Sequence, residues 1–330
     1  MEWNTRVTEI LGSKYPIIQG AFGGFGTSTL AAPVSDAGGC GIITAGALRT
    51  PDRLRQDIRK AREMTDKPVA VNISMVNRVV PLASEFCDVV IQEKVPVLFT
   101  AAYKADEVGK RAQAAGAKWI HKVATIKHAL AAERQGADAV VLVGIEGAGF
   151  KSPIQLPTLI GITTLAKVMK TPLIAAGGIG DARGFLAALA MGAEGIYMGT
   201  RFMATKECRI SERAKRALAE GDPMEPKFRD RALAPPRQEA LQQAMGERGS
   251  RPLGEWLSGV ETAMLSGARE RRQEGIDDDA RIGPAGGSLA VGVIDSVPTC
   301  KELIESIVQE AEELLIKSGP LARILKPIYA

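Results

Sequence analysis

Eight short apolar runs recur along the chain up to residue 200, and they constrain its fold more than any other feature. They occupy residues 16–20, 41–45, 68–74, 95–100, 118–123, 139–144, 172–178 and 195–200. None of the runs alternates polar with apolar residues, which is typical of parallel strands that are covered on both faces. Each run is therefore predicted to be a strand of a parallel sheet.

Segments with helical periodicity lie between these runs. One spans residues 51–64 behind Thr50, a favoured N-cap residue, and three others end at Gly116, Gly136 and Gly192. A glycine suits the position after a helix because that position needs a positive φ. Eight strand–helix repeats exceed the usual size of an open sheet, so the sequence predicts an α/β fold of the (β/α)₈ TIM barrel type.

The strand–helix rhythm breaks after Thr200. Residues 206–288 are rich in Arg, Glu, Gln and Pro and are predicted to form a small helical cap, or substrate domain. We therefore expect a barrel over residues 1–205, the cap over 206–288, and a return to the barrel over 289–330. A helix in this last part is expected to close the barrel.

Bulk properties exclude several classes of protein. The net charge of +4 is small for 330 residues and gives no reason to expect a nucleic acid or a membrane as partner. The four cysteines form no C-x-x-C pair, no cluster has metal-ligand spacing, and no apolar run approaches a membrane span. We expect a cytosolic protein without a metal that acts on a small molecule. Its oligomeric state stays open, with a homodimer as one option.

The last two predicted strands end in small residues. Gly177 and Gly178 follow the seventh strand, and Gly199 and Thr200 end the eighth. Backbone N–H groups at these two strand ends commonly hold a phosphate in TIM barrels. Two tight turns without a ligand are the alternative, but both glycine pairs occur at the expected strand numbers, which favours a phosphate site.

Other strand ends suit a flat polar ring. The segment from Gly20 to Gly23 offers backbone N–H and C=O groups with little side-chain obstruction, and Asn72 offers a donor and an acceptor on one amide. Lys122 places a positive charge where a reduced flavin would develop negative charge. Together with the phosphate site, these residues predict flavin mononucleotide (FMN) as cofactor. His121, next to Lys122, is expected to face the helix layer because side chains alternate along a strand.

Four segments resemble the nitronate monooxygenases, formerly called 2-nitropropane dioxygenases, and the related NAD(P)H-dependent quinone reductases and FMN-dependent enoyl-ACP reductases. They read PIIQGAFGG, HKVATIKHALAAERQGADAV, GIEGAGF and AAGGIGDARGFLAALAMGAEGIYMGTRFMAT. The resemblance covers most of residues 10–210 and implies an FMN-binding (β/α)₈ barrel with a small second domain. It also implies FMN contacts at Gly20, Ala21, Phe22, Asn72, Lys122, Gly149, Gly177, Gly178, Gly199 and Thr200.

The loop after the sixth run departs from the family pattern. Many relatives have histidine where this chain has Phe150, and many carry an acid where Val143 stands. A phenylalanine can pack or stack but cannot act as a general base. The resemblance therefore implies that the proton-handling group is missing, and Phe150 is expected to line the pocket in its place. The catalytic group stays unassigned, with Lys122 as the candidate for stabilising reduced flavin.

The remaining polar and aromatic side chains have simpler interpretations. Glu146 and Lys151 flank the same loop; contact with the ligand is one option, and solvated loop charges are the preferred interpretation. Tyr197 is expected to be a packing residue, and His128 lies in a helix pattern. None of these four residues is assigned to catalysis.

The sequence favours an FMN-dependent oxidoreductase that passes hydride from NAD(P)H to an electron-poor acceptor, such as an α,β-unsaturated acyl thioester, an enone or a quinone. Water or a backbone donor could supply the late proton, so losing the histidine harms this chemistry less than nitronate oxidation. An arginine-rich cap would suit a coenzyme A thioester.

The alternatives are a nitronate monooxygenase that uses O₂ and a non-catalytic flavin-binding protein. An IMP dehydrogenase-like enzyme is disfavoured because this loop has no cysteine.

Overall fold

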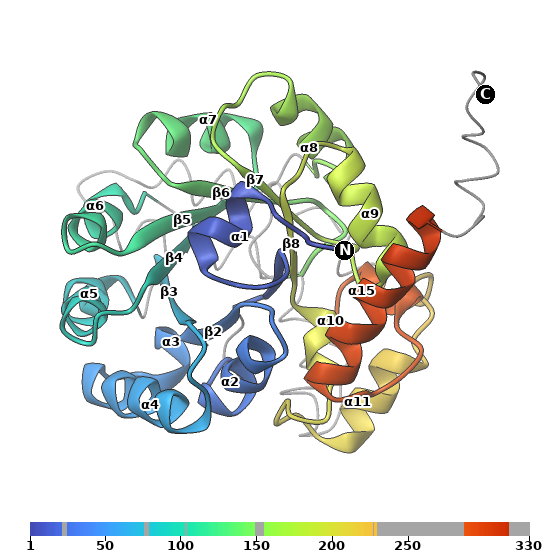
Figure 1. The fold of residues 1–330 in the computed structure, drawn as a ribbon, viewed down its shortest axis with the longest axis horizontal. Helices are drawn as coiled ribbons and strands as arrows, with labels where there is room; N and C mark the ends of the chain where they lie inside the picture. Colours follow the sequence, from blue (N-terminus) through green and yellow to red (C-terminus); the bar gives the residue numbers. More distant parts are fainter. Residues whose placement is uncertain are drawn as a thin grey trace.

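Eight parallel strands curl into a barrel in the computed structural model of this chain (Figure 1). The structure describes residues 1–21, 25–75, 79–102, 104–148, 155–226, 228–229 and 287–316. The strands are β1 (Ile17–Gln19), β2 (Gly41–Thr44), β3 (Val69–Met75), β4 (Val97–Ala102), β5 (Lys118–Val123), β6 (Ala139–Val143), β7 (Leu173–Ala176) and β8 (Gly195–Met198). Each strand overlaps the apolar run predicted for it, so the TIM barrel is confirmed.

The barrel closes between β1 and β2 through a short seam. The N–H of Cys40 donates to the carbonyl oxygen of Ile17, and the N–H of Gln19 donates to the carbonyl oxygen of Cys40, both at 2.9 Å. The fully buried Gln19 side chain extends this seam, because its Oε1 accepts from the N–H of Ile42 at 2.9 Å. A side-chain amide thus replaces one ladder hydrogen bond at the point of closure.

Helices surround the barrel and are amphipathic where they cover it. The larger ones are α2 (Ser28–Asp36), α4 (Pro51–Met64), α5 (Ala83–Gln92), α6 (Asp106–Ala114), α7 (Ile126–Arg134), α8 (Thr158–Ala166), α9 (Ala182–Ala190), α11 (Glu212–Ala219) and α15 (Cys300–Ile316). Shorter ones are α1 (Arg6–Leu11), α3 (Ala45–Leu48), α10 (Thr200–Met203) and the 3₁₀ helices η1 (Val80–Leu82) and η4 (Leu289–Val293). Helix α15 packs against both α9 and α2, so it completes the ring of helices (Figure 1).

The predicted helix ends are confirmed by their geometry. The Thr50 hydroxyl accepts from the N–H of Arg53 at the start of α4. Gly116, Gly136 and Gly192 have φ values of +92°, +89° and +97° after α6, α7 and α9. The sequence signals for capping therefore correspond to real caps at these positions.

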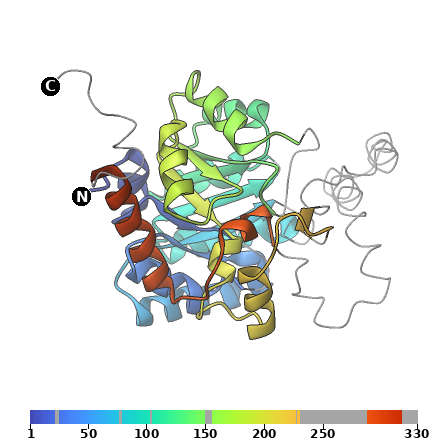
Figure 2. The same ribbon diagram turned by 90° about the vertical axis from the view of Figure 1, so that its right-hand side faces the viewer.

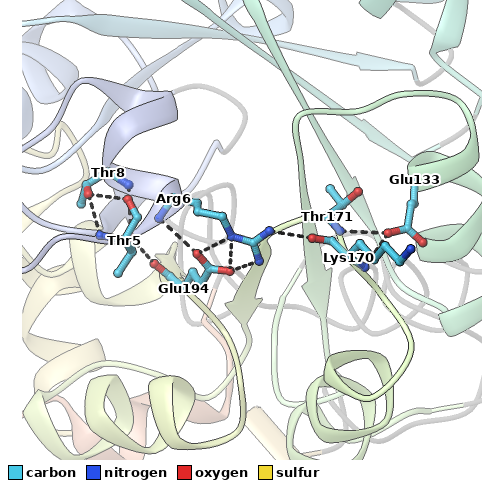
Figure 3. Close-up of polar contacts among 7 residues, drawn as sticks. All are labelled: Thr5, Arg6, Thr8, Glu133, Lys170, Thr171 and Glu194. Carbon is cyan, nitrogen blue, oxygen red and sulfur yellow. Dashed lines mark hydrogen bonds and ion pairs between the residues drawn. The ribbon is translucent and has the colours of Figure 1, made fainter.

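Helix α1 closes the N-terminal end of the barrel. Its Val7 and Leu11 are buried in the cluster that fills the barrel interior. Arg6 fastens the helix from outside, since its guanidinium pairs with Glu194 and donates to the carbonyl oxygen of Lys170 at 2.7 Å (Figure 3). Helix α1 thus covers one end of the interior, and the η4 segment lies toward the opposite end (Figure 2).

Part of the predicted cap lies outside the described residues. The described part contains α11, whereas residues 227 and 230–286 fall outside it. Within the described ranges, no helix is long and apolar enough to span a bilayer. The same ranges hold no group of three or more His, Cys, Asp or Glu side chains that could bind a metal ion.

Gly41 lies so close to α2 that no side chain fits there. A Cβ atom at this position would lie 1.9 Å from the carbonyl oxygen of Ala31. We expect Gly41→Ala to lower the free energy of unfolding by about 3 kcal/mol, because the backbone of a packed helix cannot move aside without disturbing the core. Urea titration measures this loss, and an unchanged midpoint would contradict the packing of α2 on β2.

Candidate active site

Three of the predicted site residues share one layer of the barrel interior. The strand register, with side chains alternating inward and outward, places Gly20, Asn72, Lys122 and Ala176 at one level. Alternate strands contribute each such layer in a TIM barrel. The inward positions of the even-numbered strands at the next level toward the C-terminal end are Thr44, Ala101, Val143 and Gly199. These two layers form the floor of the candidate site.

Lys122 brings a positive charge to this floor that no described carboxylate pairs with. Its Nζ lies 5.9 Å from the centroid of the Tyr197 ring, and it makes no hydrogen bond to the part of the chain that the structure describes. Desolvation lowers the pKa of Lys122 from its ordinary value of 10.5 to about 8. A partly buried ammonium without an anion favours a ligand that carries or develops negative charge.

Tyr197 supports the loop that follows β1. Its ring is 6% exposed, and its hydroxyl oxygen accepts from the N–H of Ala21 at 2.5 Å. A Cβ atom at Gly20 would lie 2.9 Å from this ring and 3.0 Å from Gly199. The packing predicted for Tyr197 is confirmed, and Gly20 is glycine because β1 and β8 approach each other closely here. Phe22 lies outside the described residues.

The ends of β7 and β8 expose a group of backbone donors. Gly177 and Gly178 have φ values of +102° and +75°, which only glycine adopts readily. Among the described residues, no acceptor pairs with the N–H groups of Gly178, Gly180, Gly199 and Thr200. A Cβ atom at Gly199 would meet no described atom within 4 Å. Free backbone donors at two neighbouring strand ends fit an anion such as a phosphate.

The Thr200 hydroxyl is already occupied by the return segment of the chain. It donates to Ser288 Oγ at 2.9 Å and accepts from the N–H of Ser288 at 3.1 Å. The next residue, Leu289, donates its N–H to the carbonyl oxygen of Glu146 at 3.1 Å. The return segment therefore ties the end of β8 to the loop after β6, and only the backbone N–H of Thr200 is free for a ligand.

Two glycines of the loop after β6 are required by close contacts within the protein. A Cβ atom at Gly144 would lie 2.1 Å from Thr158 Oγ1, and one at Gly147 would lie 2.6 Å from the Val143 side chain. The expectation that Glu146 is a solvated charge was wrong. Its carboxylate accepts from the N–H and the hydroxyl of Thr158 at 2.9 and 2.7 Å, at the start of α8. Gly149, Phe150 and Lys151 lie outside the described residues.

The two histidines lie away from the barrel mouth. His121 Nδ1 is 2.7 Å from the hydroxyl of Thr100, which also accepts from Trp119 Nε1 at 2.7 Å. Burial lowers the pKa of His121 to about 4, so this ring is neutral at physiological pH. The predicted orientation of His121 toward the helix layer is confirmed, and His128 is exposed on α7. Neither imidazole can take the place of the missing family histidine.

The chain was compared with known proteins. It matches the family model of nitronate monooxygenases over residues 4–310. A Mycobacterium tuberculosis protein named (3aS,4S,5R,7aS)-5-hydroxy-7a-methyl-1-oxo-octahydro-1H-indene-4-carboxyl-CoA dehydrogenase is 30% identical, covering 94% of this chain and 97% of its own. A probable nitronate monooxygenase of Staphylococcus saprophyticus is 33% identical over 67% of this chain and 74% of its own. The structure of FabK from Thermotoga maritima has a TM-score of 0.75 at 33% identity, covering 94% of this chain and 96% of its own.

The barrel and these relatives define an enzyme of the flavin-dependent oxidoreductase class. Within that class, the chain belongs to the nitronate monooxygenase family. The resemblance that the sequence motifs indicated is thereby confirmed. The residues present also fit the cofactor of such an enzyme, because the free donors after β7 and β8 suit a phosphate and Lys122 suits an electron-rich ring.

Proposed function

We propose that this enzyme binds FMN and passes hydride from NAD(P)H to an electron-poor acceptor, such as an α,β-unsaturated acyl thioester, an enone or a quinone. Bound FMN would supply the hydride transfer. The observation that carries the proposal is the Lys122 ammonium, which pairs with no described residue and lies in one layer with Gly20 and Asn72. Structural lysines are normally paired, so this one favours a site for negative charge.

Different residues at the barrel mouth are proposed to bind different parts of FMN. The backbone N–H groups of Gly178, Gly199 and Thr200 are proposed to hold the phosphate. The amide of Asn72 is proposed to bind the polar edge of the ring. Its Oδ1 accepts from the Ser74 hydroxyl at 2.8 Å, which fixes the orientation of the amide. Lys122 would then balance the negative charge that reduction creates.

A coenzyme A thioester is supported as the substrate class by one relative, although a dehydrogenase takes hydride from its thioester and the proposed reaction delivers hydride to an unsaturated one. The mycobacterial relative is named for a coenzyme A thioester and aligns over 97% of its length. Replacement of the family histidine by Phe150 also favours a reaction whose proton comes from water or a backbone donor. The cap over residues 206–288 is proposed to select the acceptor, since it leaves the barrel at its C-terminal end.

Nitronate monooxygenase activity is the second candidate. The family and the staphylococcal relative carry that name. A nitronate is already an anion, so Lys122 could attract it and no general base would be needed. The absent histidine makes this the weaker candidate.

Anaerobic mixing tests the proposed function. The purified enzyme should release FMN rather than FAD on denaturation, and either NADH or NADPH should bleach the flavin absorbance rapidly. Bleaching by ethyl nitronate, but by neither nicotinamide, would instead support the monooxygenase. A flavin that stays oxidised with all three reductants would contradict both activities.

A substitution at Phe150 tests why the family histidine is missing. We expect Phe150→His to raise the rate with ethyl nitronate, because an imidazole with a pKa near 6.5 could accept a proton or pair with the nitronate. A well-held general base contributes about 10²–10⁴-fold, but Val143 stands where relatives carry an orienting acid, so we expect roughly tenfold or less. Steady-state rates with one nitronate and one enone measure the change. An equally fast wild type would show that Phe150 does not mark altered chemistry.

A further inference from the structure

Thr44 has an unusual hydroxyl group at the end of β2. The residue is 5% exposed, and its Oγ1 is the one buried side-chain nitrogen or oxygen without a hydrogen-bond partner in the described ranges. Thr44 is also the N-cap of α3, a position where threonine usually bonds the helix N–H groups. Its side chain makes no such bond. The hydroxyl therefore makes no hydrogen bond to helix α3 or to any described core residue.

The side chain of Thr44 faces the open end of the barrel interior. Ile42, two residues earlier, belongs to the interior cluster, whereas Ile43 belongs to the cluster under the helices. Alternation then turns Thr44 inward. Thr44 pairs in register with Asn72 on β3, and Lys122 on β5 faces the same space. Two side chains that have no polar partner among the described residues, one hydroxyl and one ammonium, thus face the same end of the barrel interior.

We infer that Thr44 is a further cofactor-binding residue, whose hydroxyl hydrogen-bonds the polar edge of the flavin ring beside Asn72. A buried hydroxyl without a partner is costly, and a ligand that supplies the partner removes that cost. An uncharged donor and acceptor at this position suits the carbonyl and imide groups of a flavin better than a second charge would. This inference rests on the proposed function, because it needs a flavin in the barrel mouth.

The test compares flavin affinity with the stability of the apo protein. Thr44→Val keeps the shape and removes the hydroxyl, whereas Thr44→Ser keeps the hydroxyl. We expect Thr44→Val to raise the dissociation constant of FMN about fivefold to tenfold, the effect of one hydrogen bond. The melting temperature of its apo form should stay the same or rise, because no bond is lost there. Thr44→Ser should restore the affinity to within about twofold.

Thr65→Val serves as the matched control. Thr65 is also buried, at 8% exposure, but its hydroxyl accepts from the N–H of Lys67 at 3.2 Å, far from the barrel mouth. This variant should melt earlier as apo protein and bind FMN with unchanged affinity. Fluorescence quenching of FMN and thermal melting of the apo forms provide both readouts.

Two results would overturn the inference. An unchanged FMN dissociation constant in Thr44→Val would show that the hydroxyl does not contact the cofactor. A weaker affinity together with a lower apo melting temperature would assign Thr44 a structural role like that of Thr65. Either result leaves the proposed function intact if the wild type binds FMN. A wild type that binds no flavin at all would refute the proposed function itself, and the inference with it.

Discussion

Gly199→Val should abolish tight FMN binding without unfolding the protein. Gly199 has φ −93° and ψ −71°, a conformation that any residue can adopt, and a Cβ atom there would meet no described atom within 4 Å. The branched side chain would therefore fill the space in front of the free N–H groups after β7 and β8. Losing one or two hydrogen bonds to a phosphate should raise the FMN dissociation constant by about 10²-fold or more.

Two comparisons separate this effect from a general disturbance. Riboflavin lacks the phosphate, so its affinity should change far less than that of FMN. Gly177→Ala should behave differently from Gly199→Val, because a residue at φ +102° is strained and its Cβ atom would lie 3.0 Å from the backbone nitrogen of Gly147. We expect that variant to lose thermal stability as apo protein. If Gly199→Val bound FMN with the affinity of the wild type, the phosphate could not lie at the end of β8.

Lys122→Met should slow hydride transfer through the flavin by roughly 10²-fold, the usual effect of removing one group that stabilises developing negative charge. Methionine has a similar length and no charge to desolvate, so the apo protein should become more stable rather than less. Stopped-flow absorbance measures the rate, and thermal melting measures the stability. A slower rate together with a less stable apo form would instead mean that Lys122 supports the fold.

The same lysine predicts a pH dependence of apo stability. The pKa of Lys122 is about 8 in the folded protein, against 10.5 ordinarily. Between these values the unfolded chain binds more protons, so the contribution of Lys122 to stability rises with pH across this window. Below about pH 8 the full cost of the buried charge is present. Lys122→Met should lack this rise, which urea titrations of both apo proteins from pH 7 to 10 would detect.

Strands and helix ends were predictable because their signals are local. The capping residues Thr50, Gly116, Gly136 and Gly192 act within one helical turn, and apolar runs mark strands wherever both faces are covered. Inward and outward facing of neighbouring residues was equally predictable, as the opposite directions of His121 and Lys122 show. Such features depend on few residues close together in sequence.

The missed features depend on contacts between distant segments. The sequence around Glu146 indicates a charged loop residue. Its hydrogen bond with Thr158, at the start of α8, forms only in the folded chain. Gly144 is similarly constrained, because Thr158, which is distant in sequence, packs against it. Thr44 looked like an ordinary strand residue. The sequence indicates only that Thr44 ends a strand. That its hydroxyl has no hydrogen-bond partner among the described residues can be seen only in the folded structure.

The central proposal, that reduced flavin in this enzyme passes hydride to an electron-poor acceptor, an unsaturated thioester above all, is tested most directly by the oxidative half-reaction. Photoreduced enzyme is mixed under argon with crotonyl-CoA, and flavin absorbance and product are followed together. The account predicts rapid return of the oxidised spectrum, with one equivalent of butyryl-CoA formed per flavin. A flavin that stays reduced with crotonyl-CoA, with cyclohexenone and with benzoquinone, yet oxidises promptly with O₂, would contradict it.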